Sequence, residues 1–103
     1  MRYEWDERKN RENQRKHDGI SFELAIRVFE DEHRLLRLDR VDDNGEQRWH
    51  VIGAVWLAPG VGDVMTVVHV YRGNSDGEEI VRIISARWAS HDEYRRYQEQ
   101  EMD

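Results

Sequence analysis

Four short strand-like segments, each bounded by a turn signal, constrain the fold of this chain more than any other feature. The segments are residues 35–41, 48–56, 64–72 and 79–87. They are separated by Asn44-Gly45, by Ala58-Pro59-Gly60 and by the Gly-rich residues 73–77. Turns of this composition join strands that are neighbours in an antiparallel sheet. The sequence therefore predicts a four-stranded antiparallel meander.

Helical patterns flank the four segments. Phe22, Ala25, Ile26 and Phe29 follow the i, i+3, i+4, i+7 spacing of an amphipathic helix, which predicts a helix over residues 21–30 that begins at the cap residue Ser21. A polar stretch over residues 6–17, with Asp6 as its cap, predicts a first helix on the surface.

A capping box predicts the last helix. Ser90 and Glu93 have the spacing of this motif, and the helix is expected to reach Gln100. Tyr94 and Tyr97 share one of its faces and are expected to pack it on the sheet. The expected class is α+β, with two N-terminal helices packed on a four-stranded antiparallel sheet, plus a C-terminal helix. Residues 2–5 are compatible with an additional short strand.

Composition bounds the chain to one folded domain, residues 1–103. Leu, Ile, Val and Phe account for 23 of 103 residues, which is above the roughly 20% below which disorder is expected. The absence of cysteine excludes disulfides, zinc fingers of the cysteine type and thiol catalysis. The charged N-terminus lacks a signal-peptide pattern, and no apolar stretch approaches the ~20 residues of a membrane span, so a cytoplasmic protein is expected.

The net charge of -6 argues against a generally basic nucleic-acid coat. The chain nevertheless contains 14 arginines and only two lysines. The planar guanidinium suits phosphate and carboxylate partners, although codon usage in a GC-rich genome explains the same skew equally well. Because basic and acidic residues occur in separate blocks, an acidic protein can still present a local cationic face.

Six basic residues are the main candidates for such a face, five at the ends of predicted elements and Arg82 within the last strand: Lys16, His17, Arg48, Arg72, Arg82 and Arg87. Arg82 alternates with apolar neighbours on its strand, so it either pairs with an acid from the first helix or a turn, or binds phosphate. His17 is the best candidate for a general acid or base, since imidazole titrates near neutral pH. His69, on a valine-rich strand, is expected to be buried and hydrogen-bonded.

Carboxylates around the first turn provide the only other candidate site. Asp39, Asp42, Asp43 and Glu46 match no calcium-loop pattern, so a turn is the favoured interpretation over a metal site. No cofactor is expected.

Specific motifs resemble the BrnT family of type II toxin–antitoxin toxins. They are Tyr3-Glu4-Trp5-Asp6-Glu7-Arg8-Lys9-Asn10 with Asn13, Arg15-Lys16-His17, Gly19-Ile20-Ser21-Phe22-Glu23, Ala25, Val28-Phe29, Gly45-Glu46-Gln47-Arg48, Ile52-Gly53, Val67-Val68-His69, Tyr71-Arg72, Arg82-Ile83-Ile84-Ser85-Ala86-Arg87, Glu93 and Tyr97. The chain departs from the family pattern in three places: Asp18 interrupts Lys-His-Gly-Ile, Val70 replaces a common threonine, and residues 56–63 are longer than the usual hairpin.

The resemblance implies a RelE-like fold and a ribosome-independent ribonuclease that arrests translation. It also implies neutralisation by a BrnA-type antitoxin, as a 2:2 heterotetramer, whose ribbon-helix-helix part contacts operator DNA. Lys16, Arg48, Arg72, Arg82 and Arg87 are then expected to bind phosphate, with His17 or Glu46 as base or acid and no metal. Two alternatives remain open: a non-catalytic module that sequesters an antitoxin-like partner, and a metal-dependent nuclease using Asp42, Asp43 and Glu46.

Overall fold

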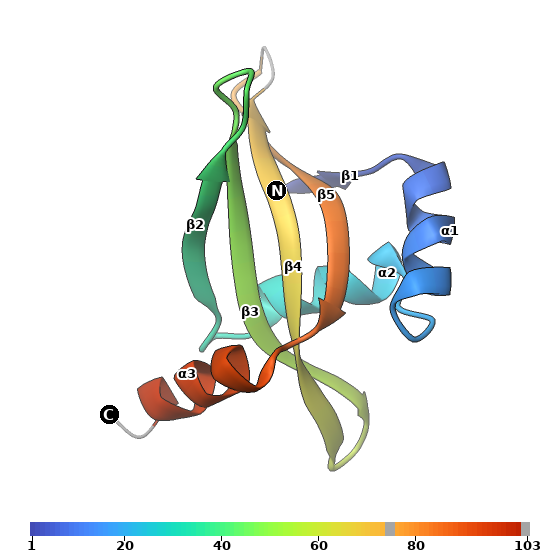
Figure 1. The fold of residues 1–103 in the computed structure, drawn as a ribbon, viewed down its shortest axis with the longest axis vertical. Coiled ribbons are helices and arrows are strands. Elements are labelled where there is room, and N and C mark those ends of the chain that lie inside the picture. Colours follow the sequence, from blue (N-terminus) through green and yellow to red (C-terminus); the bar gives the residue numbers. More distant parts are fainter. Residues whose placement is uncertain (74–75, 102–103) are drawn as a thin grey trace.

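A computed structural model describes residues 1–73 and 76–101 of the chain. The elements are β1 (Arg2–Glu4), α1 (Glu7–Lys16), α2 (Phe22–Ala25), the 3-10 helix η1 (Ile26–Glu30), β2 (Leu35–Val41), β3 (Gln47–Ala58), β4 (Val61–Gly73), β5 (Glu79–Trp88) and α3 (His91–Glu101). The predicted α+β class is confirmed (Figure 1). The expected loop over residues 73–77 includes residues 74 and 75, which lie outside the described residues.

The sheet has five strands in the order β1-β5-β4-β3-β2. Strands β2 to β5 form the predicted antiparallel meander. The prediction of a purely antiparallel, four-stranded sheet is wrong, because β1 adds to the edge of β5 in parallel, with Tyr3 opposite Val81. This pairing joins Glu4 to Arg82, 78 positions later in the chain, and no local turn signal predicts such a contact.

Helices lie on both faces of the sheet, which corrects the expected arrangement as well. The face covered by α2 and η1 holds the larger core, where Phe22, Ala25 and Val28 are fully buried against β3, β4 and β5. On the opposite face, α3 covers only one end, where Tyr97 packs on Ile52 and Val64. The expectation that Tyr97 packs α3 on the sheet is confirmed, whereas Tyr94 remains 38% exposed.

The predicted helix caps are confirmed. The side chain of Asp6 accepts a hydrogen bond from Arg8 N, and that of Ser21 accepts one from Leu24 N. The helix expected over residues 21–30 is not continuous, because it changes after Ala25 into the tighter η1. Asp18 adopts a left-handed backbone conformation, with φ 54°, in the connection that follows α1.

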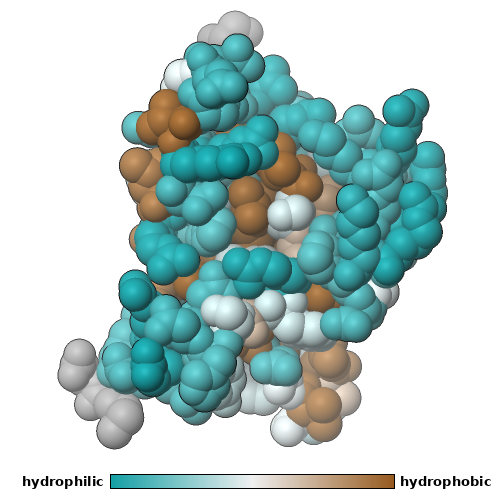
Figure 2. Space-filling model, viewed as in Figure 1, coloured by the Kyte–Doolittle hydropathy of each residue, from teal (hydrophilic) through white to brown (hydrophobic). Residues whose placement is uncertain are grey.

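The hairpin between β3 and β4 extends well past the rest of the sheet, as Figure 1 shows at its lower edge. Both strands are longer than predicted, and Gly60, with φ 75°, forms the expected break between them. The tip exposes Trp56, Leu57 and Val61, and part of it is hydrophobic in Figure 2. These apolar side chains therefore lie at the surface, beyond the core of the sheet.

Candidate active site

One face of the sheet collects the arginines. Side chains alternate along a strand, so the residues that share the side of α3 can be read from the strand register. We call this side the arginine face, defined by Arg37, Arg40, Arg48, Arg72, Arg82 and Arg87. Figure 2 views the molecule from this side, where hydrophilic residues cover most of the surface. Four of these six arginines were candidates from the sequence.

Glu4 joins two of the predicted arginines. It lies in β1 beside Arg82, and its Oε2 accepts hydrogen bonds from NH1 of Arg82 at 2.5 Å and from NH1 of Arg72 at 3.3 Å. Arg82 therefore has an acidic partner, but that partner comes from β1 and not from the first helix or a turn. All three side chains keep about a third or more of their surface exposed, so both arginines are accessible from solvent.

Glu93 organises the other end of the arginine face. It is 4% exposed, and its carboxylate binds both NH1 and NH2 of Arg87, at 2.6 and 3.0 Å. Thr66 and the backbone of Ser90 also donate to it, and the predicted capping box is thereby confirmed. Burial acts to raise the pKa of Glu93, but these donors outweigh burial and lower it to about 2. Glu93 is therefore a fixed negative charge that holds Arg87 in place.

His50 lies between these groups and the edge strand β2. It is 9% exposed. Its Nε2 is 3.5 Å from Asp39 and its Nδ1 is 3.4 Å from NH2 of Arg37. Burial lowers the pKa of His50 below 6.5, despite the opposing charges of Asp39 and Glu93. The imidazole is therefore neutral near pH 7 and able to accept a proton, within a cluster of charged side chains.

The guanidinium of Arg48 is incompletely satisfied. Its Nε is buried and has no hydrogen-bond partner within residues 1–73 and 76–101. Asp42 approaches this nitrogen only to 3.7 Å, and Arg40 lies directly opposite on β2. Two like charges in a cross-strand pair destabilise a sheet. An anion placed between them would satisfy both guanidinium groups.

Three sequence candidates lie away from the arginine face. Lys16 and His17 end α1 and line a small depression with Ile84 and Ser85, at the edge of β5. Glu46 belongs to the turn between β2 and β3, where it lines a groove with Trp49 on the other side of the sheet. The structure thus brings together Arg48, Arg72, Arg82 and Arg87, and it places Lys16, His17 and Glu46 apart from them.

Sequence reasoning missed Glu4, Arg37, Asp39, His50 and Glu93 as members of the candidate site. One signal for His50 was present: it lies two positions after Arg48 in β3, and residues two apart on a strand point to the same face of the sheet. For Asp39 no such signal existed, because a register irregularity between Leu38 and Arg40 directs it toward His50.

The predicted turn around Asp42 is confirmed: its Oδ1 accepts hydrogen bonds from the backbone of Asn44 and Glu46. Over the described residues, no three His, Asp or Glu side chains converge as a potential metal site. His69 is fully buried with Nδ1 3.2 Å from the carbonyl oxygen of Val67, so the expectation of a buried, hydrogen-bonded histidine is confirmed.

The fold and this face define a small α+β protein with an arginine-rich surface around a neutral histidine. A family described as "Ribonuclease toxin, BrnT, of type II toxin-antitoxin system" matches residues 5–93. The chain belongs to the BrnT toxin family, which is a family of ribonuclease toxins that act with an antitoxin. No curated protein matches the chain significantly. None of the described helices is long and apolar enough to cross a membrane.

Proposed function

We propose that the arginine face cleaves RNA by metal-independent acid–base chemistry, in the cytoplasm and without the ribosome. The observation that supports this is the convergence of Arg48, Arg72, Arg82 and Arg87 on one surface around His50. These arginines come from three neighbouring strands, so they form a rigid array of donors. A rigid array suits the phosphate of an RNA chain, which accepts several hydrogen bonds at once.

The proposed reaction uses the ribose 2′-OH as the nucleophile. A base removes the 2′-OH proton, the oxygen attacks the adjacent phosphorus, and the bond from phosphorus to the 5′-oxygen breaks. An acid then protonates the departing 5′-oxygen. Negative charge accumulates on the non-bridging oxygens, where preorganised arginine donors stabilise the transition state most effectively. Because DNA lacks the 2′-OH, it should resist cleavage.

Position favours His50 as the proton-transfer group over the two residues expected from the sequence. His50 is neutral and lies on the same face as the arginines, whereas His17 and Glu46 are at the edges of the sheet. Lys16 and His17 border β5, so they are placed to hold an RNA strand that leaves the arginine face. In this proposal the arginines of this face bind the phosphates of the RNA and stabilise the transition state, and Glu93 positions Arg87.

An RNA degradation assay on the purified toxin tests the proposal. Substituting Arg82→Ala should reduce cleavage by roughly 10²–10³-fold, by analogy with the loss of an oxyanion donor. His50→Gln should reduce it comparably, His17→Ala and Glu46→Gln much less. Activity should persist in EDTA. Wild-type rates for both Arg82→Ala and His50→Gln would show that the site is wrong.

The antitoxin is proposed to be a BrnA-type ribbon-helix-helix protein that forms a 2:2 complex and alone contacts operator DNA. The acidic balance of the toxin, 16 basic against 22 acidic residues, supports the assignment of DNA binding to the partner. A gene for such a protein beside the toxin gene, and a complex mass matching two copies of each, would support it.

The same acidic balance favours the second candidate, a non-catalytic module that only sequesters the antitoxin. Absence of RNA loss and of growth arrest on expression would favour that module.

A further inference from the structure

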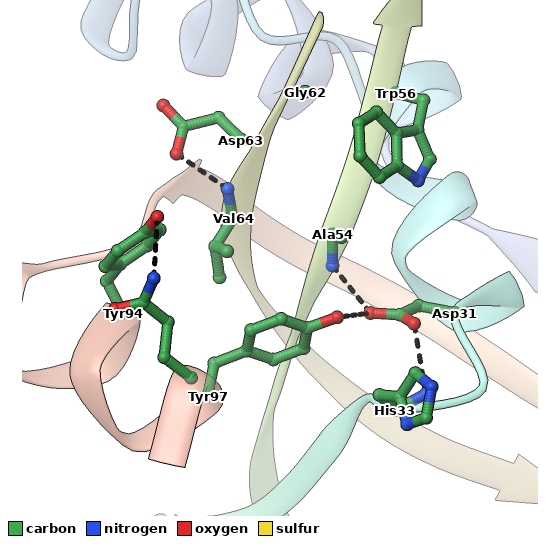
Figure 3. Close-up of a pocket in the computed structure, with 10 residues that line it drawn as sticks. Asp31, His33, Ala54, Trp56, Gly62, Asp63, Val64, Tyr94 and Tyr97 are labelled. Atoms are coloured by element: carbon green, nitrogen blue, oxygen red, sulfur yellow. Dashed lines mark hydrogen bonds between the residues drawn. The ribbon is translucent and has the colours of Figure 1, made fainter. Parts of the chain in front are cut away.

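A pocket lies on the same side of the sheet as the arginines but apart from them, between α3 and the projecting β3–β4 hairpin (Figure 3). Its volume is about 290 Å³. Trp56, Tyr94 and Tyr97 supply aromatic walls, and Asp31 and Asp63 supply carboxylates. In Figure 3 Tyr94 and Tyr97 of α3 and the indole of Trp56 stand on different sides of the space, with Asp31 at the hydroxyl end of Tyr97 and Asp63 beside Val64. The proposed ribonuclease reaction uses none of these residues.

The carboxylate of Asp31 is fixed and ionised. It accepts hydrogen bonds from the backbone of Ala54 at 2.7 Å, from the hydroxyl of Tyr97 at 2.5 Å and from the backbone of His33 at 3.0 Å. Burial acts to raise the pKa of Asp31, but the donors outweigh burial and lower this pKa overall. A carboxylate has about four acceptor sites, so three bonds leave room for one further donor.

Asp63 adds a second negative charge with no internal counterion. Its Oδ1 accepts a hydrogen bond from the backbone of Val64 at 2.8 Å, and within the described chain it forms no ion pair. An adjoining cavity of about 490 Å³ shares Asp31 and Trp56 with the pocket and adds Glu30, Glu32 and Arg27. Four carboxylates therefore line the two cavities that share Trp56, together with Arg27 and His33.

Trp56 is exposed but held in place. Its side chain is 64% exposed, yet the indole lies directly on Gly62, where an added Cβ would come within 2.6 Å of Cε3 of the ring. Glycine at this position therefore permits the indole to lie flat against the hairpin. A large side chain that is ordered before binding loses little entropy when a partner covers it, which is typical of an interface anchor.

We propose that this pocket receives an arginine or lysine side chain of the antitoxin, which docks its cation between the aromatic walls and the two aspartates. Aromatic faces attract cations, and a nearby carboxylate supplies a charged acceptor for the same group. The exposed Leu57 and Val61 at the hairpin tip would pack against apolar residues of the antitoxin segment that carries this cation. The inference deepens the proposed function, on which it rests for the identity of the partner.

RNA does not fit this chemistry. The carboxylates of Asp31 and Asp63, with Glu30 and Glu32 beside them, repel the phosphate groups that would accompany a base stacked on Trp56. The pocket also lies on the far side of α3 from the arginines of β5, so a partner bound there does not compete with substrate for the same donors. Protein recognition and RNA cleavage are thus assigned to separate surfaces.

Isothermal titration of the purified antitoxin into toxin variants tests the proposal. Trp56→Ala should weaken binding by about 30-fold or more, as expected for an interface anchor. Asp63→Asn keeps the acceptor for Val64 N and removes only the charge, and it should weaken binding about 10-fold, with a smaller effect at high salt. The matched control is Leu38→Ala, which changes an exposed apolar residue on β2 instead. Circular dichroism and RNA cleavage by each variant without antitoxin should match wild type.

A double-mutant cycle identifies the antitoxin residue that enters the pocket. Each arginine and lysine of the antitoxin is replaced by methionine and paired with Asp63→Asn, and one position should show a coupling of about 10-fold or more. No coupled position, or a loss of binding with Leu38→Ala but not with Trp56→Ala, would overturn the proposal. Loss of RNA cleavage with Trp56→Ala in a folded protein would assign the pocket to RNA. Because free-toxin cleavage is measured separately, an inactive wild type would contradict the proposed function and leave the binding result interpretable.

Discussion

The side-chain amide of Asn13 pairs with the backbone of Ala86 as a neighbouring strand would. Its Nδ2 donates to Ala86 O at 2.8 Å, and its Oδ1 accepts from Ala86 N at 3.0 Å. The edge of β5 is thereby closed where β1 has ended. Nδ2 also donates to Ile20 O at 3.0 Å, so a single residue joins α1, the connection to α2 and the sheet. This arrangement explains how a helix with no apolar stripe is held on the protein.

Replacing Asn13 with aspartate should destabilise the fold. The variant keeps the acceptor for Ala86 N but directs a buried negative charge at the carbonyl oxygens of Ile20 and Ala86. We expect the free energy of unfolding, measured in urea, to fall by about 2–4 kcal/mol. Arg15→Ala, at an exposed position of the same helix, is the control and should change it by less than about 0.5 kcal/mol. Equal stability of the two variants would contradict the role of Asn13.

The buried His69 should make stability depend on pH. Burial lowers its pKa from 6.5 to about 4 in the folded protein. The unfolded chain therefore binds more protons between these values, and stability falls as pH decreases from 6.5 to about 4. The expected loss is about 3 kcal/mol. His69→Phe, which preserves the ring packing against Phe29 and Tyr71, should flatten the pH dependence in this window.

The measurement is urea unfolding at pH 7.0, 5.5 and 4.0. The exposed His91→Gln provides the matched control, since it removes a histidine without altering a buried site. An unchanged pH slope in His69→Phe would show that His69 does not carry the effect.

The meander could be predicted because its information is local. Turn residues such as Gly45 and Gly60 adopt the positive φ that their turns require, and the strands between them alternate in register. The parallel pairing of β1 with β5 could not be predicted in this way. It joins residues such as Glu4 and Arg82, 78 positions apart, and depends on how α1 and α2 return the chain to the sheet.

The arginines of the candidate site were recognisable by type and by position at strand ends or, for Arg82, among apolar neighbours, but their partners were not. Arg87 and Glu93 are six positions apart across the end of β5, and only the turn into α3 brings them together. His17 lies at the edge of β5, where its helix ends, whereas His50 has its charged neighbours on β2 and α3. The chemistry of each residue could be predicted from the sequence. Which side chains lie close together depends on the pairing register of the strands, which the sequence does not show.

Glu93 should stabilise the protein only where it is ionised. Its pKa is lowered to about 2, against 4.5 for an ordinary glutamate, so its contribution is complete above 4.5 and is lost as pH falls toward 2. Glu93→Gln should lower the free energy of unfolding at pH 7 by about 3 kcal/mol, because Arg87 loses a buried bidentate partner. The difference from wild type, measured in urea, should shrink below pH 4.5. Glu99→Gln, on the exposed side of α3, should show no difference at any pH.

Arg48 should oppose stability while it supports activity. Its buried Nε has no hydrogen-bond partner in the described chain, and Arg40 faces it across the sheet. Arg48→Met retains the packing of the aliphatic stem, and it removes both the unpaired Nε and the like charge that faces Arg40. Asp42 keeps its backbone hydrogen bonds within the turn. We expect the free energy of unfolding to rise by about 1 kcal/mol and RNA cleavage to fall by roughly 10²-fold.

The control for this variant is Arg95→Met on α3, where the arginine is exposed and ion-paired with Asp92 at 2.8 Å. It should change the free energy of unfolding by no more than about 1 kcal/mol, since exposed ion pairs contribute about 0–1 kcal/mol. The rate of RNA cleavage should stay within about twofold of wild type. A short single-stranded RNA should raise the melting temperature of wild type more than that of Arg48→Met, because its phosphate supplies the missing partner of Arg48. A less stable Arg48→Met that still cleaves RNA at the wild-type rate would show that this arginine is structural.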